Sequence, residues 1–277
     1  MYNGRKGVDA PRMQRADDAG RQLAQERPVA LSIVVPAWNE AERLGATLQA
    51  LRCMADACSE ALFAGRAELV VVDDGSEDGT LAVARPLADA ALRHSRRRGK
   101  GAALRTSVQA SRGAVLLFAD ADLGESAAHL ARLLEPLAAG QADMVVARFP
   151  AAGRRGGFGL VKRLAAGGIR RLSGYEAAAP LSGQRAVRRE LLERIGPLAA
   201  GFGIEVGLTI DAVRLGYRVQ EIELPLRHRE TGRDWRGFLH RGRQFWAVLR
   251  TLALRWDSRE MSLKRLKWFK KLRTRGG

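Results

Sequence analysis

Short apolar segments alternate with amphipathic segments along the middle of this chain, and this alternation constrains the fold more than any other feature. Runs rich in Val, Ile and Leu occur at residues 31–35, 68–72, 114–119 and 143–147. Strands that are apolar on both faces need helices on both sides of a parallel sheet. The sequence therefore predicts a doubly wound α/β domain. The helices expected between the strands are marked by Leu44, Leu48 and Leu51, by Leu81, Ala84, Leu87 and Ala91, and by Leu130, Leu133, Leu134 and Leu137.

Composition divides the chain into three regions. Residues 1–28 are polar and predict a disordered N-terminus, residues 29–230 hold the α/β domain, and residues 231–277 predict a basic, amphipathic, helical C-terminus. Within the domain, the second half predicts a helix ending at Leu172, a turn at 182–184, a helix over 203–215 and a strand over 217–224. In the C-terminal region, helical spacing marks Phe245, Leu249, Leu252 and Trp256.

The chain carries a large positive charge that is concentrated near its C-terminus. Its 277 residues include 47 Lys and Arg against 30 Asp and Glu, a formal charge of +17. Residues 227–277 hold 16 of these cations and only 4 of the acids. Such a field favours anionic partners, whether nucleotides, phosphorylated substrates, anionic lipid or nucleic acid. A nucleic-acid-binding module is the weaker hypothesis, because the charge is terminal and no recognisable binding motif accompanies it. We expect no nucleic-acid partner.

The cysteines indicate a reducing compartment, and the hydropathy pattern gives no sign of a signal peptide or a membrane span. The two cysteines, Cys53 and Cys58, fit no zinc or redox spacing and are expected to be ordinary thiols. The N-terminus lacks the apolar stretch of a signal peptide, and no apolar run approaches the roughly 20 residues of a membrane span. The expected location is cytoplasmic, with peripheral membrane contact left open.

Two pairs of carboxylates come at the ends of predicted strands. Asp120 and Asp122 in FADADL lie two residues apart on an extended segment, so both side chains point the same way. Converging carboxylates suit a hard divalent cation, which can bridge the phosphates of a nucleotide. Asp73 and Asp74 in VVDDGSEDGT could accept hydrogen bonds from a ribose or from the edge of a base. For both pairs the alternative is a structural one, as solvated turn residues or helix caps.

Four motifs in order resemble family 2 glycosyltransferases of the GT-A fold. They are VVPAWNE (34–40), VVDDGSEDGT (71–80), RRRGKGAALRTS (96–107) and FADADL (118–123). Within this family the chain looks like glucosyl-3-phosphoglycerate synthases and dolichyl-phosphate mannose or glucose synthases. The resemblance covers roughly residues 31–230. It implies a metal-dependent hexosyltransferase with a mostly parallel sheet flanked by helices.

The resemblance also implies roles for individual residues on the donor side. The nucleotide-binding positions would be Pro36, Asn39, Glu40, Asp73, Asp74, Gly99, Lys100 and Asp120. Asp120 and Asp122 match the family's DxD motif, which holds Mg²⁺ or Mn²⁺ on the donor diphosphate. The metal would stabilise the departing nucleoside diphosphate. Asp122 is therefore also a candidate catalytic residue.

The acceptor half carries a second group of matched positions. PLSGQRAVRRELLE (180–193) places the candidate acceptor-binding residues Ser182, Gly183, Gln184 and Arg185. Glu205 in GFGIEVGLTIDA matches an acidic position near the reaction centre. It would orient the acceptor or, in an inverting enzyme, remove its proton. His228 falls, after a one-residue shift, near a metal-binding histidine of phosphoglycerate-type relatives.

Donor and acceptor identity stay open at this point. The expected donor is UDP-glucose, with GDP-mannose as the alternative, and the expected acceptor is a small phosphorylated acid such as 3-phosphoglycerate. A polyprenyl or dolichyl phosphate is the competing acceptor, because residues 258–273 form a candidate interfacial helix. A homodimer is also left open. A nucleotidyltransferase would instead need a Gly-rich basic loop after the first strand, where this chain has PAWNE.

Overall fold

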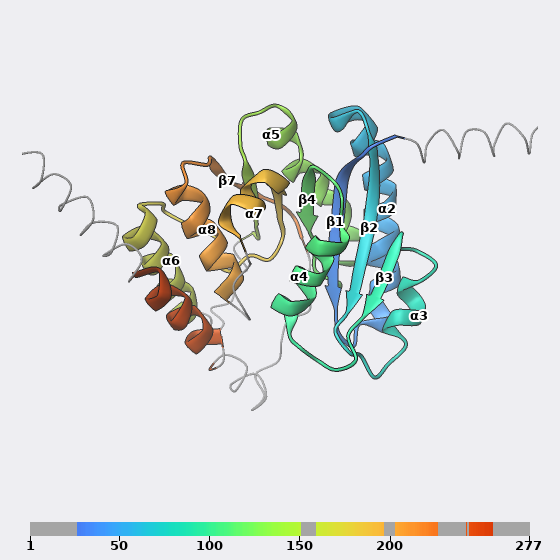
Figure 1. The fold of residues 1–277 in the computed structure, drawn as a ribbon, viewed down its shortest axis with the longest axis horizontal. Helices are drawn as coiled ribbons and strands as arrows, with labels where there is room; N and C mark the ends of the chain where they lie inside the picture. Colours follow the sequence, from blue (N-terminus) through green and yellow to red (C-terminus); the bar gives the residue numbers. More distant parts are fainter. Residues whose placement is uncertain (1–26, 151–158, 197–202, 227–241, 243, 257–277) are drawn as a thin grey trace, which may run out of the picture.

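A seven-stranded mixed sheet forms the centre of the computed structural model, which describes residues 27–150, 159–196, 203–226, 242 and 244–256. The strand order is β3-β2-β1-β4-β6-β5-β7, and helices cover both faces (Figure 1). The strands are β1 (Val29–Ala37), β2 (Arg66–Asp73), β3 (Ala90–Arg93), β4 (Val115–Phe118), β5 (Met144–Arg148), β6 (Arg185–Arg188) and β7 (Val219–Glu223).

The first half of the sheet is parallel, and β6 is the one strand of the described sheet that runs against its neighbours. β1 pairs in parallel with β2 and β4, and β2 pairs in parallel with β3. β6 is antiparallel to both β4 and β5, while β7 is parallel to β5. The carboxyl ends of β1, β2 and β4 therefore meet at one edge, and β6 begins at that same edge because it runs the opposite way.

Two apolar layers fill the spaces above and below the sheet because strand side chains alternate between its faces. Ile33 and Val35 of β1 pack with α2 (Ala41–Phe63) and the 3-10 helix η1 (Gly124–Leu133). Val34, between them, packs in the opposite layer with α4 (Lys100–Ala110), α7 (Arg189–Ile195) and α8 (Ile204–Arg214). Both layers were expected from the strands' lack of a polar face.

A third apolar cluster joins α6 (Gly159–Ser173) and α8 to a helix formed by residues 244–256. The helices approach closely at glycines. A Cβ at Gly168 would lie 2.4 Å from the Leu252 side chain, and one at Gly207 would lie 2.7 Å from Arg255. Arg255 also binds Asp211 of α8. The C-terminal helix is thus packed against the domain, while the predicted boundary at 230/231 lies outside the described residues.

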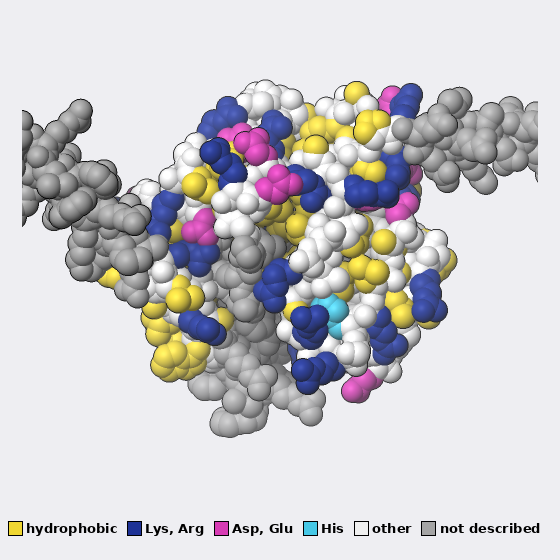
Figure 2. All heavy atoms as spheres, in the orientation of Figure 1, with side chains coloured by type: hydrophobic (Ala, Val, Ile, Leu, Met, Phe, Trp, Pro, Cys, Tyr) yellow, Lys and Arg dark blue, Asp and Glu magenta, His cyan; other side chains and the backbone are white. Residues whose placement is uncertain are grey.

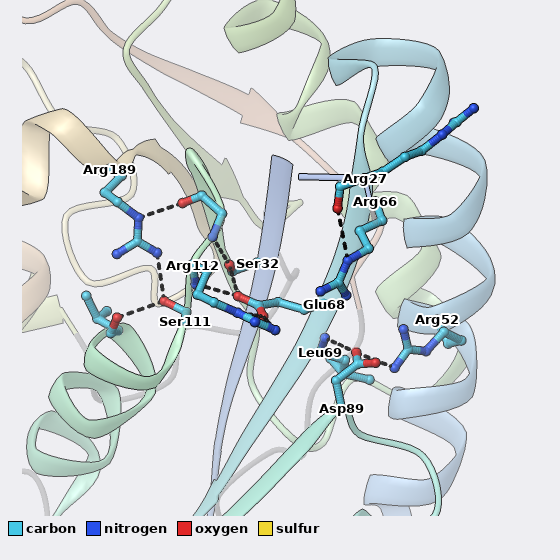
Figure 3. A network of polar contacts seen from close by, with 12 residues as sticks. Arg27, Ser32, Arg52, Arg66, Glu68, Leu69, Asp89, Ser111, Arg112 and Arg189 are labelled. Carbon is cyan, nitrogen blue, oxygen red and sulfur yellow. Dashed lines mark hydrogen bonds and ion pairs between the residues drawn. The ribbon is translucent and has the colours of Figure 1, made fainter. Parts of the chain in front are cut away.

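The amino edge of the sheet holds a polar network centred on the buried carboxylate of Glu68 (Figure 3). Glu68 of β2 accepts a hydrogen bond from Ser32 Oγ (2.7 Å) and is paired with Arg112 (3.2 Å). The Gly113 N–H donates to Ser32 Oγ (2.7 Å), and a Cβ at Gly113 would lie 2.5 Å from the Ser32 nitrogen. Because every partner belongs to a strand or its entry turn, this network fixes strand position.

Two expected elements differ in the structure, and one strand was not expected. The helix expected through Ala91 ends early, since α3 spans Thr80–Ala84 and Ala91 lies in edge strand β3. The helix through Leu130–Leu137 is η1 followed by α5 (Glu135–Ala138). Strand β6 was not expected at all, because RAVR is too short and too charged to show strand periodicity. The helices expected up to Leu172 and over 203–215 are confirmed.

No helix among the described residues is long and apolar enough to cross a membrane. Residues 1–26 of the expected disordered N-terminus and the candidate interfacial helix at 258–273 lie outside the residues that the structure describes, whereas the carbonyl oxygens of Arg27 and Pro28 accept hydrogen bonds from Arg66.

Candidate active site

The loops at the carboxyl edge of β1, β2 and β4 carry most of the residues that the motifs singled out. Ligands of open α/β sheets bind at this edge, outside the carboxyl ends of the strands. On the face shown in Figure 2, Lys and Arg side chains lie near a histidine just right of centre, where Figure 1 has the lower end of α4. The residues fall into two groups, one around Asp74 and one around Asp120.

Asp73 and Asp74, at the end of β2, hold the loops beside them. Asp73 is buried and accepts a hydrogen bond from the Ser76 N–H (2.8 Å), with Arg93 Nε 3.4 Å from its other oxygen. Asp74 is also buried and accepts hydrogen bonds from the Arg98 N–H (2.9 Å) and the Gly99 N–H (2.6 Å). Asp74 thereby fixes the turn that leads into α4 and Lys100.

The loop after β2 can approach the turn before α4 this closely because it contains Gly75. Gly75 has a φ of +74°, and a Cβ there would lie 2.7 Å from the Arg96 carbonyl carbon. His94 Nδ1 lies 2.7 Å from Asp74 Oδ1, and its Nε2 lies 3.0 Å from Thr106 Oγ1 of α4. The Asp74 carboxylate is thus anchored to the α4 entry from three directions. Its predicted contact with a nucleoside is not tested by these bonds and stays a prediction.

The loop after β1 is bound to the loop after β2 through Asn39. The Asn39 N–H donates to Ser76 Oγ (2.9 Å), and the Asn39 side-chain oxygen accepts from the Glu77 N–H (3.0 Å). The Glu40 N–H donates to Thr80 Oγ1 (2.9 Å). Pro36 lies within β1, beside Val72 of β2. These three predicted nucleotide-binding positions therefore border the two hydrogen-bonded loops of residues 38–40 and 74–79, which we call the double loop.

Sequence reasoning missed a cation–π pair at this double loop. Trp38 is 39% exposed, and the guanidinium carbon of Arg97 lies 3.4 Å from the centroid of its ring. A cation over an indole face is a favourable contact. The signal available in the sequence was a tryptophan directly after the first strand, together with the arginine run RRRGK.

Lys100 and Asp120 form the centre of the second group. Lys100 Nζ donates to Asp120 Oδ1 (2.6 Å), and Gln184 Nε2 donates to Asp120 Oδ2. Gly183 leaves room for this contact, because a Cβ there would lie 2.6 Å from Lys100 Nζ and 3.4 Å from Asp120 Oδ1. Residues from α4, from the end of β4 and from the start of β6 thus meet at one carboxylate.

Asp122 lies two residues further along, in a turn held by α2. Thr47 Oγ1 donates to the Ala121 carbonyl oxygen (2.9 Å) and accepts from the Gly124 N–H (2.8 Å). Asp122 is partly exposed between these two fixed points. The threonine of α2 therefore sets the path of the backbone that carries the DxD pair.

Glu205 reaches the same group from the first turn of α8. It is buried, and its Oε1 lies 3.9 Å from Lys100 Nζ. Burial raises the pKa of Glu205 above its ordinary value, against the opposing attraction of Lys100 and Arg185. Burial acts against the Lys100 ammonium, but Asp120 and Glu205 outweigh it and raise the pKa of Lys100. Lys100 is therefore a firmly charged ammonium between two acids.

Arg185 and Ser182 lie behind this group. Arg185 is fully buried; its Nη2 donates to the Ser182 carbonyl oxygen and its Nη1 donates to the Glu205 carbonyl oxygen (3.2 Å). Ser182 is buried as well, with its Oγ 3.4 Å from Gln184 Oε1. The guanidinium thus ties the 182–184 turn to the start of α8. This geometry makes Arg185 a positioning residue, and its predicted role in acceptor binding is not tested.

The described residues contain no group of three or more His, Cys, Asp or Glu side chains arranged to hold a metal ion. Asp120 and Asp122 supply the oxygen donors that Mg²⁺ and Mn²⁺ prefer, and Mg²⁺ is commonly bound by one or two carboxylates together with substrate phosphates. The residues present fit such a site. His228, the third predicted ligand, lies outside the described residues.

The comparisons with known proteins agree on the family of this chain. The model of the family described as "Glycosyl transferase family 2" matches residues 32–196. A glucosyl-3-phosphoglycerate synthase of Mycolicibacterium paratuberculosis is 33% identical over 211 residues, which are 67% of this chain and 61% of that protein. A polyprenol monophosphomannose synthase of Mycolicibacterium smegmatis is 30% identical over 236 residues, 79% of this chain and 86% of that protein.

A solved structure with a similar fold is glucosyl-3-phosphoglycerate synthase from Mycobacterium tuberculosis in complex with Mn²⁺, uridine-diphosphate-glucose and phosphoglyceric acid. It superposes with a TM-score of 0.66 at 28% identity, covering 91% of this chain and 85% of that one. The chain spans less than two thirds of the M. paratuberculosis relative's length.

Proposed function

The chain belongs to glycosyl transferase family 2, and on that premise we propose that it transfers a hexose from a nucleoside diphosphate sugar to a phosphate-bearing acceptor. One observation carries the proposal. Lys100, Asp120, Gln184 and Glu205, from four separate elements, converge at the carboxyl edge of the sheet. A cation, a carboxylate and a buried acid at one point suit a reaction in which a diphosphate leaves and a hydroxyl group attacks.

Mg²⁺ or Mn²⁺ is the proposed cofactor, with Asp120 and Asp122 as its protein ligands and His228 as a further candidate. When bound, a divalent ion would offset the negative charge that develops on the departing diphosphate. Support comes from the similar solved structures, which contain Mn²⁺ or Mg²⁺ with uridine diphosphate.

The proposed donor is UDP-glucose, with GDP-mannose as the alternative. Uridine-diphosphate-glucose is named in the complex of a similar structure, whereas a mannose synthase stands among the relatives. The nucleoside would lie along the double loop of Pro36, Asn39 and Glu40, with the diphosphate near Gly99 and Lys100. The helix that starts at Lys100 adds its N-terminal N–H groups to that cationic end.

The proposed acceptor is a small phosphorylated acid of the 3-phosphoglycerate class. It would approach from the 182–184 turn, where Gly183 permits close contact, and its hydroxyl group would face Glu205. The raised pKa of Glu205 brings it nearer to the range in which a carboxylate exchanges protons at neutral pH. A polyprenyl phosphate is the alternative, supported by the similarity to the polyprenol enzyme and by the basic sequence at 258–273.

A substrate matrix tests the proposal. Purified full-length chain is incubated with UDP-glucose or GDP-mannose against 3-phosphoglycerate or polyprenyl phosphate, with Mn²⁺ or with a chelator, and the product anomer is identified by NMR. Metal-dependent transfer of glucose to 3-phosphoglycerate is the expected result. Transfer to polyprenyl phosphate alone would replace the acceptor, and no metal-dependent transfer or donor binding in any combination would overturn the proposal.

A truncation separates the two acceptor classes. Ending the chain before Arg259 removes the candidate interfacial helix and leaves the described residues intact. Transfer to a small acid should be unaffected, whereas transfer to a lipid phosphate in vesicles should fall. Full activity of the truncated chain on membrane-embedded lipid would argue against a role for residues 258–273 in acceptor binding.

A further inference from the structure

Exposed hydrophobic side chains are concentrated at one place on the described surface. Five of the eight large exposed hydrophobic residues among the described residues lie on α6 or on the helix of residues 244–256. Figure 2 shows a group of hydrophobic side chains at the lower left, where Figure 1 has these helices. We call this group the apolar patch; its members are Leu160, Trp246, Leu249, Leu254 and Trp256.

The 244–256 helix is apolar on two sides. Val248 and Leu252 are buried against α6 and α8, whereas Trp246 and Leu254 are 69% and 63% exposed. An amphipathic surface helix normally turns a polar side to solvent. Here the side turned to solvent carries tryptophan and leucine, so the folded domain leaves part of the helix's hydrophobic surface uncovered. A second apolar environment would cover that part.

The charge around the apolar patch indicates what that environment is. Helix α6 and residues 244–256 together contain six Lys or Arg and no Asp or Glu, and two of the six, Arg170 and Arg255, are paired with Glu176 and Asp211 next to these helices. Arg171 also lies over the ring of Trp256, with its guanidinium carbon 4.7 Å from the ring centroid. The sequence that follows is equally basic, with eight Lys or Arg and two Asp or Glu in residues 257–277. The helices that carry the apolar patch therefore have a net positive charge, as does the sequence that follows them.

This charge decides between three occupants. A second copy of the chain would bring the same net positive charge against this one, and the chain's own C-terminal segment, with eight cations and two acids, would add more, so both would meet electrostatic repulsion. An anionic lipid surface offers hydrocarbon for the leucines, an interface for the tryptophans and negative charge for the cations. We propose that the apolar patch docks this protein on anionic membrane surfaces.

The proposal goes beyond sugar transfer, since docking requires neither donor nor metal. It also differs from the expected contact at 258–273, because it assigns binding to a folded helix that is packed on α8. Helix α8 carries Glu205 in its first turn, so docking of the apolar patch would hold α8 close to the membrane. Docking would then raise the local concentration of any lipid-borne acceptor.

Vesicle binding tests the proposal on the full-length chain. Co-sedimentation is measured with phosphatidylcholine vesicles and with equimolar phosphatidylcholine and phosphatidylglycerol vesicles. The test variant is Trp246→Ala with Leu254→Ala, which leaves the cations and residues 257–277 in place. The matched control is Leu92→Ala, which removes an exposed leucine from β3 at the opposite edge of the sheet.

The expected result is salt-sensitive binding to the anionic vesicles and little to the neutral ones. The double variant should lose at least about tenfold in partitioning, with an unchanged thermal unfolding curve, while Leu92→Ala binds as the parent does. Equal binding of the double variant and the parent would overturn the proposal, since the basic segment alone would then explain it. So would a dimer in analytical ultracentrifugation that the double variant dissociates, because the apolar patch would then be a self-association surface.

Discussion

Replacing Lys100 with Met should change the affinity for Mn²⁺ and the affinity for nucleotide in opposite directions. The Lys100 ammonium and a divalent ion compete for the same carboxylate, since Nζ lies 2.6 Å from Asp120 Oδ1. Removing the ammonium leaves Asp120 available to the metal. It also removes the cation proposed to meet the donor diphosphate, so Lys100→Met should bind Mn²⁺ alone more tightly and Mn²⁺ with UDP more weakly.

The size of the effect follows from the bond that must weaken. A hydrogen bond to a charged group contributes about 1.5–3 kcal/mol. The Lys100 and Asp120 side chains are 32% and 30% exposed, and water reduces the interaction, so the lower end applies. Because 1.4 kcal/mol corresponds to a factor of ten, Lys100→Met should tighten binding of Mn²⁺ alone by about tenfold.

Electron paramagnetic resonance of free Mn²⁺ measures this affinity directly, with and without UDP. Lys162→Met is the matched control, because Lys162 is an exposed lysine of α6, and it should change neither affinity. Gly183→Ala gives an independent route, since its Cβ would fall 2.6 Å from Lys100 Nζ and displace the flexible end of that side chain. Unchanged or weaker Mn²⁺ binding by Lys100→Met would refute the competition.

Three further predictions follow from the same structure. Asp122→Ala should abolish transfer with an unchanged circular dichroism spectrum, and near-normal turnover would contradict its metal role. Glu205→Gln should lower kcat more than it raises the KM for the donor. Because the pKa of Glu205 is raised, the kcat of the parent enzyme should fall on acidification at a higher pH than an ordinary glutamate would cause. The variant should lack this acidic decline of kcat. Asp143→Asn should lower the free energy of unfolding by about 1 kcal/mol at neutral pH, because its hydrogen bonds to Arg218 lower the pKa of Asp143. That difference should vanish as the pH falls below the ordinary value of 3.8 and through the lower folded-state pKa, and a pH-independent difference in urea titrations would disprove it.

The first half of the fold could be predicted from the sequence because its strands are buried on both faces. The segments containing Val34, Val70 and Leu117 are apolar on both faces apart from Ser32 and Glu68 near their starts, so they are recognisable as central strands without knowledge of their partners. The carboxylates that end them also fall at the carboxyl edge by necessity. The family resemblance and its fold, which rested on motifs at these strand ends, are confirmed.

The second half depended on contacts that the sequence does not reveal. Strand β6 is four residues long and contains two arginines, and it is a strand by virtue of its antiparallel pairing with β4 on one side and β5 on the other. Likewise, Ala91 follows a helical spacing from Leu81, but pairing with Val71 places it in an edge strand. Tertiary pairing outweighs local propensity at such short segments.

The candidate site divides in the same way. The sequence alone determined which residue types stand at the strand ends, because those types and their spacing are local properties of the chain. Only the tertiary structure decided their partners: Asp74 holds the α4 entry, Lys100 contacts Asp120, and buried Arg185 positions the turn beside Glu205. The physical reason is that each of these contacts joins segments far apart in the chain, brought together by the order of the strands in the sheet.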